Sequence, residues 1–160
     1  MKEIHPKDLL KNLHIDGELR RWDLIAAYVF VKDYLEKGFK NKIYDYISYK
    51  KWLHINKTRN IANYSIYDLV CQRQMFFSLI LNINKNGFNP DNPIILTENG
   101  MIFDGLHRSA VMLYFDRKIP YVVRECGSGI GFDINWYEKN ILDKYVKRIK
   151  QEYSLIMEDV

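Results

Sequence analysis

The sequence predicts an α+β fold in a single domain of 160 residues, with helices in its N-terminal half and a compact α/β unit behind them. Apolar residues make up 48% of the chain, which is enough for a sizeable hydrophobic core. Residues 20–38 and 65–87 carry apolar side chains at helical spacing, and residues 94–125 combine short β-type runs with one helical segment. The expected parts are a helical N-terminal part (1–60), a central core (61–125) and a C-terminal loop and helix (126–160), with a domain boundary near residue 60 as the alternative.

Two helices are expected in the N-terminal part. In residues 20–38 the apolar side chains recur every three or four positions, which is typical of a helix with a buried face. Gly38 follows the last of them, and glycine is the preferred residue beyond a helix C-terminus. Residues 43–55 predict a second helix, and the polar stretch 55–63 is typical of a loop.

A long helix is expected over residues 65–87. Ser65 is followed three positions later by Asp68, a spacing that resembles the capping box of helix N-termini, and Gly87 follows the last apolar position. Seven residues are expected to share one side of this helix: Tyr67, Val70, Cys71, Phe76, Leu79, Ile80 and Ile83.

Residues 94–125 are expected to form a β-turn-β-α-β unit. The short runs 93–97 and 101–104 flank an Asn-Gly pair, which is preferred in the tight turn of a β-hairpin. Residues 106–115 then have helical character, and residues 121–125 predict the next strand. A strand-to-helix junction therefore follows directly on the hairpin.

The C-terminal part begins with a glycine-rich stretch, GSGIG, at residues 127–131. Its spacing is one residue short of a dinucleotide-binding fingerprint, and no acidic residue follows at a strand end. We therefore expect a loop here, one that could close over a ligand. Asp133 is expected to cap a last amphipathic helix over residues 134–153.

The chain is mildly basic, with a net charge of +4 and a pI of about 8.9. Lys and Arg are mixed with acidic residues, so we expect solvated helix faces and no nucleic-acid partner. The sequence has no run of 18 apolar residues and no signal peptide, so we expect a cytoplasmic protein without membrane contact. Cys71 and Cys126 match no metal-binding spacing, which predicts buried free thiols in a reducing compartment.

The stretch IFDGLHRSA places five chemically distinct residues at the strand-to-helix junction: Asp104, Gly105, His107, Arg108 and Ser109. A helix N-terminus presents free N–H groups and a partial positive charge, and the last three of these residues add side-chain donors. Together they suit a phosphate group. Asp104 does not suit a passive anion site, so we expect it to hold a metal ion or to accept a proton from a hydroxyl. A plainer interpretation is also open, in which Asp104 caps the helix, His107 is a turn residue and Arg108 pairs with a nearby acid.

The longer segment MIFDGLHRSAVMLYFDRKIPYVV resembles the ParB/sulfiredoxin-like superfamily, whose members place D/G-G-x-H-R between a strand and a helix. A following strand that starts near Ile-Pro, and a preceding helix, Pro-Ile strand and hairpin, extend the resemblance to about residues 65–125. The resemblance implies the α/β module of that superfamily, with a small mixed sheet. It also implies that nucleotide phosphates bind at the helix start, on Gly105, Leu106, His107, Arg108 and Ser109.

The branches of this superfamily differ in features that the sequence contains or lacks. Sulfiredoxins carry a catalytic cysteine where this chain has Leu106, so a sulfinic-acid reductase is not expected. Chromosome-partition members bind CTP and continue into a long DNA-binding region, whereas 35 residues follow Glu125 here. The free-serine kinase branch uses D-G-x-H-R to phosphorylate a small hydroxyl compound and needs no cysteine. The resemblance is therefore closest to the kinase branch.

The segment ELRRWDLIAAYVFVKDYL resembles the R-x-D helix start of small proteins of the same superfamily that occur with surface-polysaccharide genes. This resemblance implies that Arg21 and Asp23 reach the same cleft as the D-G-x-H-R motif. Arg21 would contact phosphate or an acidic substrate, and Asp23 a substrate hydroxyl or a metal. Glu18 is a further candidate base. The alternative is a simple charge pair at a helix start.

These observations predict a nucleotide-dependent phosphotransferase that acts on a hydroxyl of a small polyol, sugar or amino acid, in the setting of surface-polysaccharide precursor synthesis. The expected cofactors are ATP, or ADP or CTP, and Mg²⁺. The expected site residues are Asp104 (catalysis and metal), His107 and Asp23 (catalysis), and Arg21, Asp23 and Glu18 (substrate). Two other classes stay open: a non-catalytic regulator that binds CTP or ATP, and a DNA- or partner-binding module of the ParB type.

Overall fold

The computed structural model describes residues 1–38, 42–59, 65–125 and 132–159. The expected glycine-rich loop and Cys126 lie outside the described residues. Cys71, which was expected to be buried, is a free and only half-buried thiol on the helix over residues 66–86. No helix in the described part of the chain is both long and apolar enough to cross a membrane.

The N-terminal part is less uniformly helical than expected. It contains β1 (Lys2–Ile4), α1 (Pro6–Asn12), β2 (His14–Ile15), β3 (Glu18–Leu19), α2 (Trp22–Lys37) and α3 (Ile43–Arg59). The strand β1 joins the main sheet, whereas β2 and β3 pair only with each other. Each of these strands has two or three residues, which is too short for an alternating pattern to show in the sequence.

Two helices differ in extent from the prediction. Residues 55–59 continue α3, where a loop was expected. Ile55 still packs against the core, about two helical turns beyond the buried Ile47. The long helix α4 (Ile66–Asn86) begins with the expected capping box, in which the Asp68 N–H donates to Ser65 Oγ. From Tyr67 to Met75, however, its side chains are exposed or half-buried, and its buried positions begin at Phe76.

The main sheet has four strands in the order β1-β6-β4-β5. The hairpin of β4 (Ile94–Thr97) and β5 (Ile102–Asp104) is confirmed, and β6 (Ile119–Arg124) lies parallel to β4 and antiparallel to β1. The helix α5 (Leu106–Phe115) connects β5 to β6. The expected small mixed sheet of an α+β fold is thus present, with an N-terminal edge strand that was not expected.

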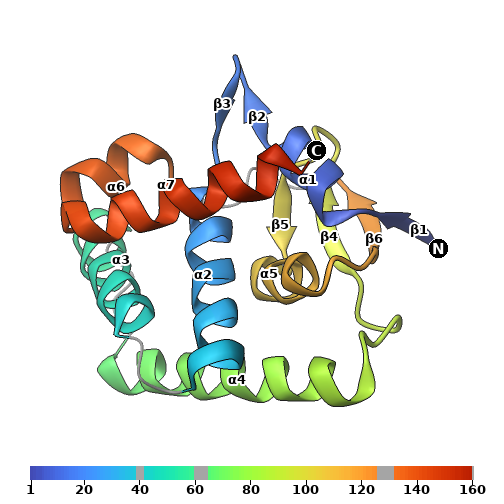
Figure 1. The fold of residues 1–160 in the computed structure, drawn as a ribbon, viewed down its shortest axis with the longest axis horizontal. Helices are drawn as coiled ribbons and strands as arrows, with labels where there is room; N and C mark the ends of the chain where they lie inside the picture. Colours follow the sequence, from blue (N-terminus) through green and yellow to red (C-terminus); the bar gives the residue numbers. More distant parts are fainter. Residues whose placement is uncertain (39–41, 60–64, 126–131, 160) are drawn as a thin grey trace.

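The helices α2 and α5 lie at the centre of the molecule. In Figure 1, α5 lies between α2 and the sheet, α4 runs along the bottom of the view, and α7 (Asp143–Glu158) crosses the upper part. Most of α2 is buried because its sequence is apolar on nearly every side from Trp22 to Val31. Since α2 packs closely on α5, the start of α2 lies near the junction of β5 and α5.

The single C-terminal helix predicted over residues 134–153 is two helices, α6 (Ile134–Asn140) and α7. Asp133 caps α6 as expected, since its side chain accepts from the Trp136 N–H at 2.9 Å. The Asn140 side chain donates to the Trp136 carbonyl, and Ile141 is extended, with φ −111° and ψ 143°. This side-chain bond competes with continued helix and ends α6 there.

Candidate functional site

The D-G-x-H-R motif lies at the junction of β5 and α5, as the sequence predicts. Gly105 is the N-cap of α5 and has a φ of +99°, which favours glycine. A Cβ at this position would lie 2.5 Å from Ile94 Cγ2, so no other residue fits without movement of the strand behind it. Because glycine carries no side chain, α5 starts without a side-chain cap, and no N-cap side chain accepts from its first N–H groups.

Arg108 is held by the wall of the site. Its Nη2 donates to Asp104 Oδ2 at 2.8 Å, and its Nη1 donates to the Asn92 carbonyl at 2.6 Å and the Pro93 carbonyl at 3.2 Å. Arg108 therefore ties the end of β5 to the turn before β4. The pairing of Arg108 with a nearby acid is the plainer interpretation raised from the sequence, and that acid is Asp104 itself.

The motif's other side chains face different surroundings. The Ser109 hydroxyl is buried and donates to the Gly105 carbonyl at 2.9 Å, within the helix. The His107 ring stacks on Phe76, with ring centroids 4.2 Å apart, and its Nε2 lies 3.2 Å from the Tyr44 hydroxyl. Burial, together with the positive charge of Lys51, lowers the pKa of His107 to about 4. His107 is therefore a neutral imidazole at pH 7.

Arg21 and Asp23 form a buried, bidentate ion pair at the start of α2. Arg21 Nε donates to Asp23 Oδ1 and Arg21 Nη2 donates to Asp23 Oδ2, both at 2.9 Å. The remaining Arg21 nitrogen, Nη1, donates to the Ile102 carbonyl on β5 at 2.7 Å. The pair thus fixes the beginning of α2 against the strand that leads into the motif. It is charge-paired, as the alternative interpretation held, but it is buried and not at the solvated surface.

Lys51 is a charged residue of the site that the sequence analysis missed. It comes from α3, is half-buried, and holds its Nζ over the Phe132 ring at 5.0 Å. Burial lowers the pKa of Lys51 to about 8, with the charge of Arg21 acting in the same direction and that of Asp23 against it. In the sequence Lys51 follows Lys50 in a polar helix, so nothing distinguished it from a solvated lysine.

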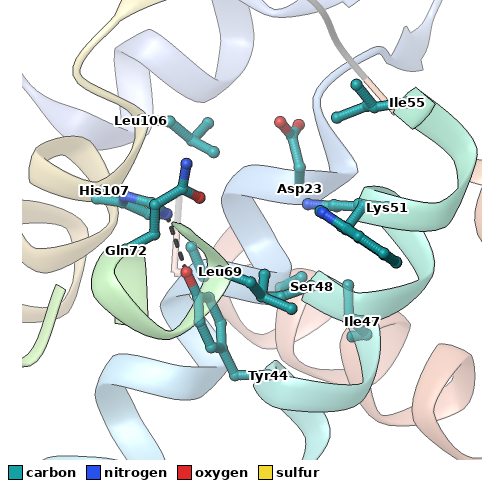
Figure 2. A pocket seen from close by; sticks show the side chains of 13 residues that line it. Asp23, Tyr44, Ile47, Ser48, Lys51, Ile55, Leu69, Gln72, Leu106 and His107 are labelled. Carbon is teal, nitrogen blue, oxygen red and sulfur yellow. Dashed lines mark hydrogen bonds between the residues drawn. The ribbon is translucent and has the colours of Figure 1, made fainter. Parts of the chain in front are cut away.

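These residues line two adjoining cavities. The larger, of about 530 Å³, opens at the start of α5 and includes Arg21, Phe103, Asp104, Gly105 and Arg108 among its lining residues. The smaller, of about 130 Å³, lies between α2, α3, α4 and α5 and includes Asp23 and Lys51. Three residues line both cavities: Gln72, Leu106 and His107. Figure 2 shows these three, with Asp23 and Lys51, around the space of the smaller cavity.

Comparison of the chain with protein-family models, with curated proteins and with solved structures gives no match. What the site can bind follows from its geometry and its charge.

The structure brings together most of the residues expected in the site. Residues of the D-G-x-H-R motif line the larger cavity together with Arg21 and the smaller cavity together with Asp23, although the two stretches are about 80 positions apart in the sequence. Glu18 and Ser109 line neither cavity: Glu18 is exposed on β3, and the Ser109 hydroxyl faces into α5.

Asp104 is the residue at which a metal ion could be held. Its side chain is 60% exposed at the larger cavity, and only one of its oxygens pairs with Arg108. In the described ranges no group of three His, Cys, Asp or Glu residues is arranged around a single point. The donor set therefore fits Mg²⁺ only where nucleotide phosphates complete the coordination, which is the usual way that proteins hold this ion.

Proposed function

We propose that the chain is a nucleotide-dependent phosphotransferase with a ParB/sulfiredoxin-like core, and that it phosphorylates a hydroxyl of a small molecule. One observation carries the proposal: an open cavity at the glycine-capped start of α5 shares a wall with a small cavity that contains charged residues. A reaction between a large donor and a small acceptor requires the two to be held close together and aligned, and two adjoining cavities can do this. The surface-polysaccharide setting rests on the resemblance of the R-x-D segment.

The larger cavity suits the nucleotide. Its volume of about 530 Å³ falls in the range of ordinary ligand sites, about 300–1,000 Å³. The uncapped N-terminus of α5 favours phosphates. Met75 and Phe103 also line this cavity with side chains that are 71% and 48% exposed. Exposed apolar side chains beside an anion site suit a nucleobase.

The smaller cavity suits the acceptor. Asp23 lies in it with its carboxylate held in one orientation by Arg21, and would accept the proton of the attacking hydroxyl. His107 lies in the wall between the cavities. As a neutral ring it would donate a hydrogen bond to the transferring phosphoryl group.

Asp104 would hold Mg²⁺ together with the nucleotide phosphates. The bound ion would neutralise phosphate charge during transfer. Arg108 positions Asp104 for this task through the ion pair at 2.8 Å.

Nucleotide binding is the first test of this function. We expect ATP, ADP or CTP with Mg²⁺ to raise the melting temperature, because a ligand at 100 times its Kd stabilises a protein by about 2.7 kcal/mol. The responding nucleotide is then used as the donor in a phosphorus NMR screen of small hydroxyl compounds. Absence of binding by all of ATP, ADP, CTP and GTP would contradict the proposal.

A non-catalytic nucleotide-binding regulator is the second candidate, and one observation favours it. Both Asp23 oxygens already accept hydrogen bonds from Arg21, which occupies positions that an attacking hydroxyl would need. A regulator would bind nucleotide without consuming it. Consumption of nucleotide that depends on an added hydroxyl compound would decide for the phosphotransferase.

A further inference from the structure

The charges around the smaller cavity do not balance. The Asp23 carboxylate is neutralised by the bidentate contact with Arg21, and His107 is neutral at pH 7. Lys51 is the remaining charged residue that lines the cavity, and no carboxylate of the described residues lies within ion-pair distance of its Nζ. The cavity therefore has a net positive charge that no side chain described in the structure compensates.

The ammonium group of Lys51 is positioned to contact a ligand in the cavity. Figure 2 shows its side chain reaching from α3 toward the space beside Asp23. On the other side its ammonium lies over the rings of Phe132, at 5.0 Å, and Tyr137, at 5.7 Å. An ammonium group held against apolar rings loses part of its hydration, and an anionic group of a ligand would replace it.

The size and the neutral groups of the cavity restrict its ligand. Its volume of about 130 Å³ equals that of roughly four water molecules at about 30 Å³ each, so a molecule of three or four carbon atoms fits. Ser48 and Gln72 provide a hydroxyl and an amide for the polar groups of such a molecule. A cationic group has no partner here, because the one carboxylate in the cavity already pairs with Arg21.

We propose that the smaller cavity binds a small hydroxy acid, with the acid's carboxylate on Lys51 and its hydroxyl facing Asp23. In naming this acid as the acceptor, the inference rests on the proposed phosphotransferase function. It narrows the acceptor class from neutral polyols, sugars and amino acids to short hydroxy acids.

Direct binding to the full chain tests the inference. Glycerate and lactate are the probes, glycerol is the neutral counterpart and serine the counterpart with an added ammonium group. Calorimetric titrations are made with and without a non-hydrolysable analogue of the nucleotide that binds. We expect one or both hydroxy acids to bind more tightly than glycerol and serine. Lys51→Met should weaken that binding by about tenfold or more, because the variant loses a charge-assisted hydrogen bond to the carboxylate.

Lys50→Met is the matched control, because Lys50 neighbours Lys51 on α3 but lies over the Tyr46 ring and lines neither cavity. It should leave the affinity for hydroxy acids unchanged. If Lys51→Met does not fold, acetylation of the wild-type chain gives the same information. Glycerate should then slow the labelling of Lys51 and leave Lys50 unaffected, whereas glycerol should protect neither.

The outcomes separate this inference from the function on which it rests. Four results would overturn the hydroxy-acid site and leave the phosphotransferase intact. The first two are equal binding of glycerate and glycerol, and tighter binding of serine than of the hydroxy acids. The other two are unchanged affinity for hydroxy acids in Lys51→Met, and no binding of either hydroxy acid to the nucleotide-bound protein. Lys51-dependent binding of a hydroxy acid without any nucleotide binding would keep the site and remove the phosphotransferase.

Discussion

At the scale of single residues, Gly105 determines the shape of the site. Its positive φ turns the chain from β5 into α5, and its missing Cβ leaves room for Ile94 directly behind it. The same absence of a side chain leaves the first turn of α5 uncapped. One residue thus allows the close packing of β4 behind the junction and leaves the start of α5 without a side-chain cap.

Gly105→Ala should destabilise the fold by about 2–4 kcal/mol, because it adds left-handed backbone strain and a clash with Ile94. Urea unfolding followed by circular dichroism measures the loss. Gly100→Ala is the control, since Gly100 also has a positive φ, of +78°, but its Cβ would meet only Asn12 Cβ at 3.6 Å. The control should lose about 1–2 kcal/mol. Equal losses in the two variants would show that the Ile94 contact has no effect.

The lowered pKa of His107 makes the stability of the fold sensitive to acid. A histidine that titrates near 6.5 when unfolded and near 4 when folded stabilises the native state above pH 6.5, and this stabilisation is lost as the pH falls toward 4. From pH 7 to pH 4.5 the loss should be about 2–3 kcal/mol. His107→Gln should flatten the dependence of the unfolding free energy on pH over this interval. Parallel curves for wild type and variant would contradict the assignment.

Sequence analysis identified the motif residues because five chemically distinct residues stand within one stretch of six residues. It could not foresee that Arg108 takes Asp104 as its partner, since that depends on how β5 meets α5. It missed Lys51 because the residue's distinguishing property is burial among residues of other elements, Phe132 among them. A cluster of reactive residues within one short stretch can be recognised in a sequence. The surroundings of a single charged side chain depend on residues far along the chain and cannot be recognised in this way.

At the scale of elements, α7 is fixed to α2 by a network of buried charges. Arg148 on α7 donates to Asp33 on α2 at 2.9 Å and to Glu152 at 3.2 Å, and Lys32 on α2 donates to Glu152 at 2.9 Å. Both carboxylates are buried. The network therefore aligns the two helices, and α2 in turn places Arg21 and Asp23 in the site.

Arg148→Met should destabilise the fold by about 2 kcal/mol, because Asp33 and Glu152 would lose a partner while buried. The loss stays below the roughly 3–5 kcal/mol of a fully buried pair, since Arg148 is itself partly exposed and both Lys37 and Lys32 remain. Lys147→Met, which removes an exposed pair with Asp143, should leave the unfolding free energy nearly unchanged, because solvent screens this pair. Similar losses for both variants would contradict a buried network.

The elements differ in how well their sequences predict them. The helices α2 and α4 and the β4–β5 hairpin carry long periodic runs, capping residues or an Asn-Gly turn, and all were located correctly. The division of α6 from α7 depends on one side-chain bond of Asn140, and β1 depends on pairing with a strand near the other end of the chain. Such features follow from tertiary contacts and not from local pattern.

At the scale of the whole molecule, the candidate site is built from several helices and one strand. The strand β5 and the helices α2, α3, α4 and α5 all supply side chains to the two cavities. The proposed nucleobase position illustrates this assembly, because Met75 comes from α4 and Phe103 from β5. Neither segment forms that surface alone.

Phe103→Ala should weaken nucleotide binding by about tenfold, because an aromatic side chain stacked on a base contributes about 1–3 kcal/mol. Since Phe103 is exposed, the melting temperature without nucleotide should change little. Leu81→Ala truncates another exposed apolar side chain that is not among those lining the larger cavity, so it should leave the affinity unchanged. Equal nucleotide affinity in wild type and Phe103→Ala would place the base elsewhere.

The pairing of β1 with β6 has a consequence for how the chain folds as it is made. Ile4 pairs with Ile119, so β1 has no neighbouring strand in this sheet until 115 further residues have been synthesised. During that time residues 2–4 are unpaired in the nascent chain, and contacts of such long range form slowly. The order of synthesis therefore delays completion of the sheet until β6 has been made. A ribosome-bound chain that stops short of residue 119 would present its N-terminal strand to chaperones and proteases.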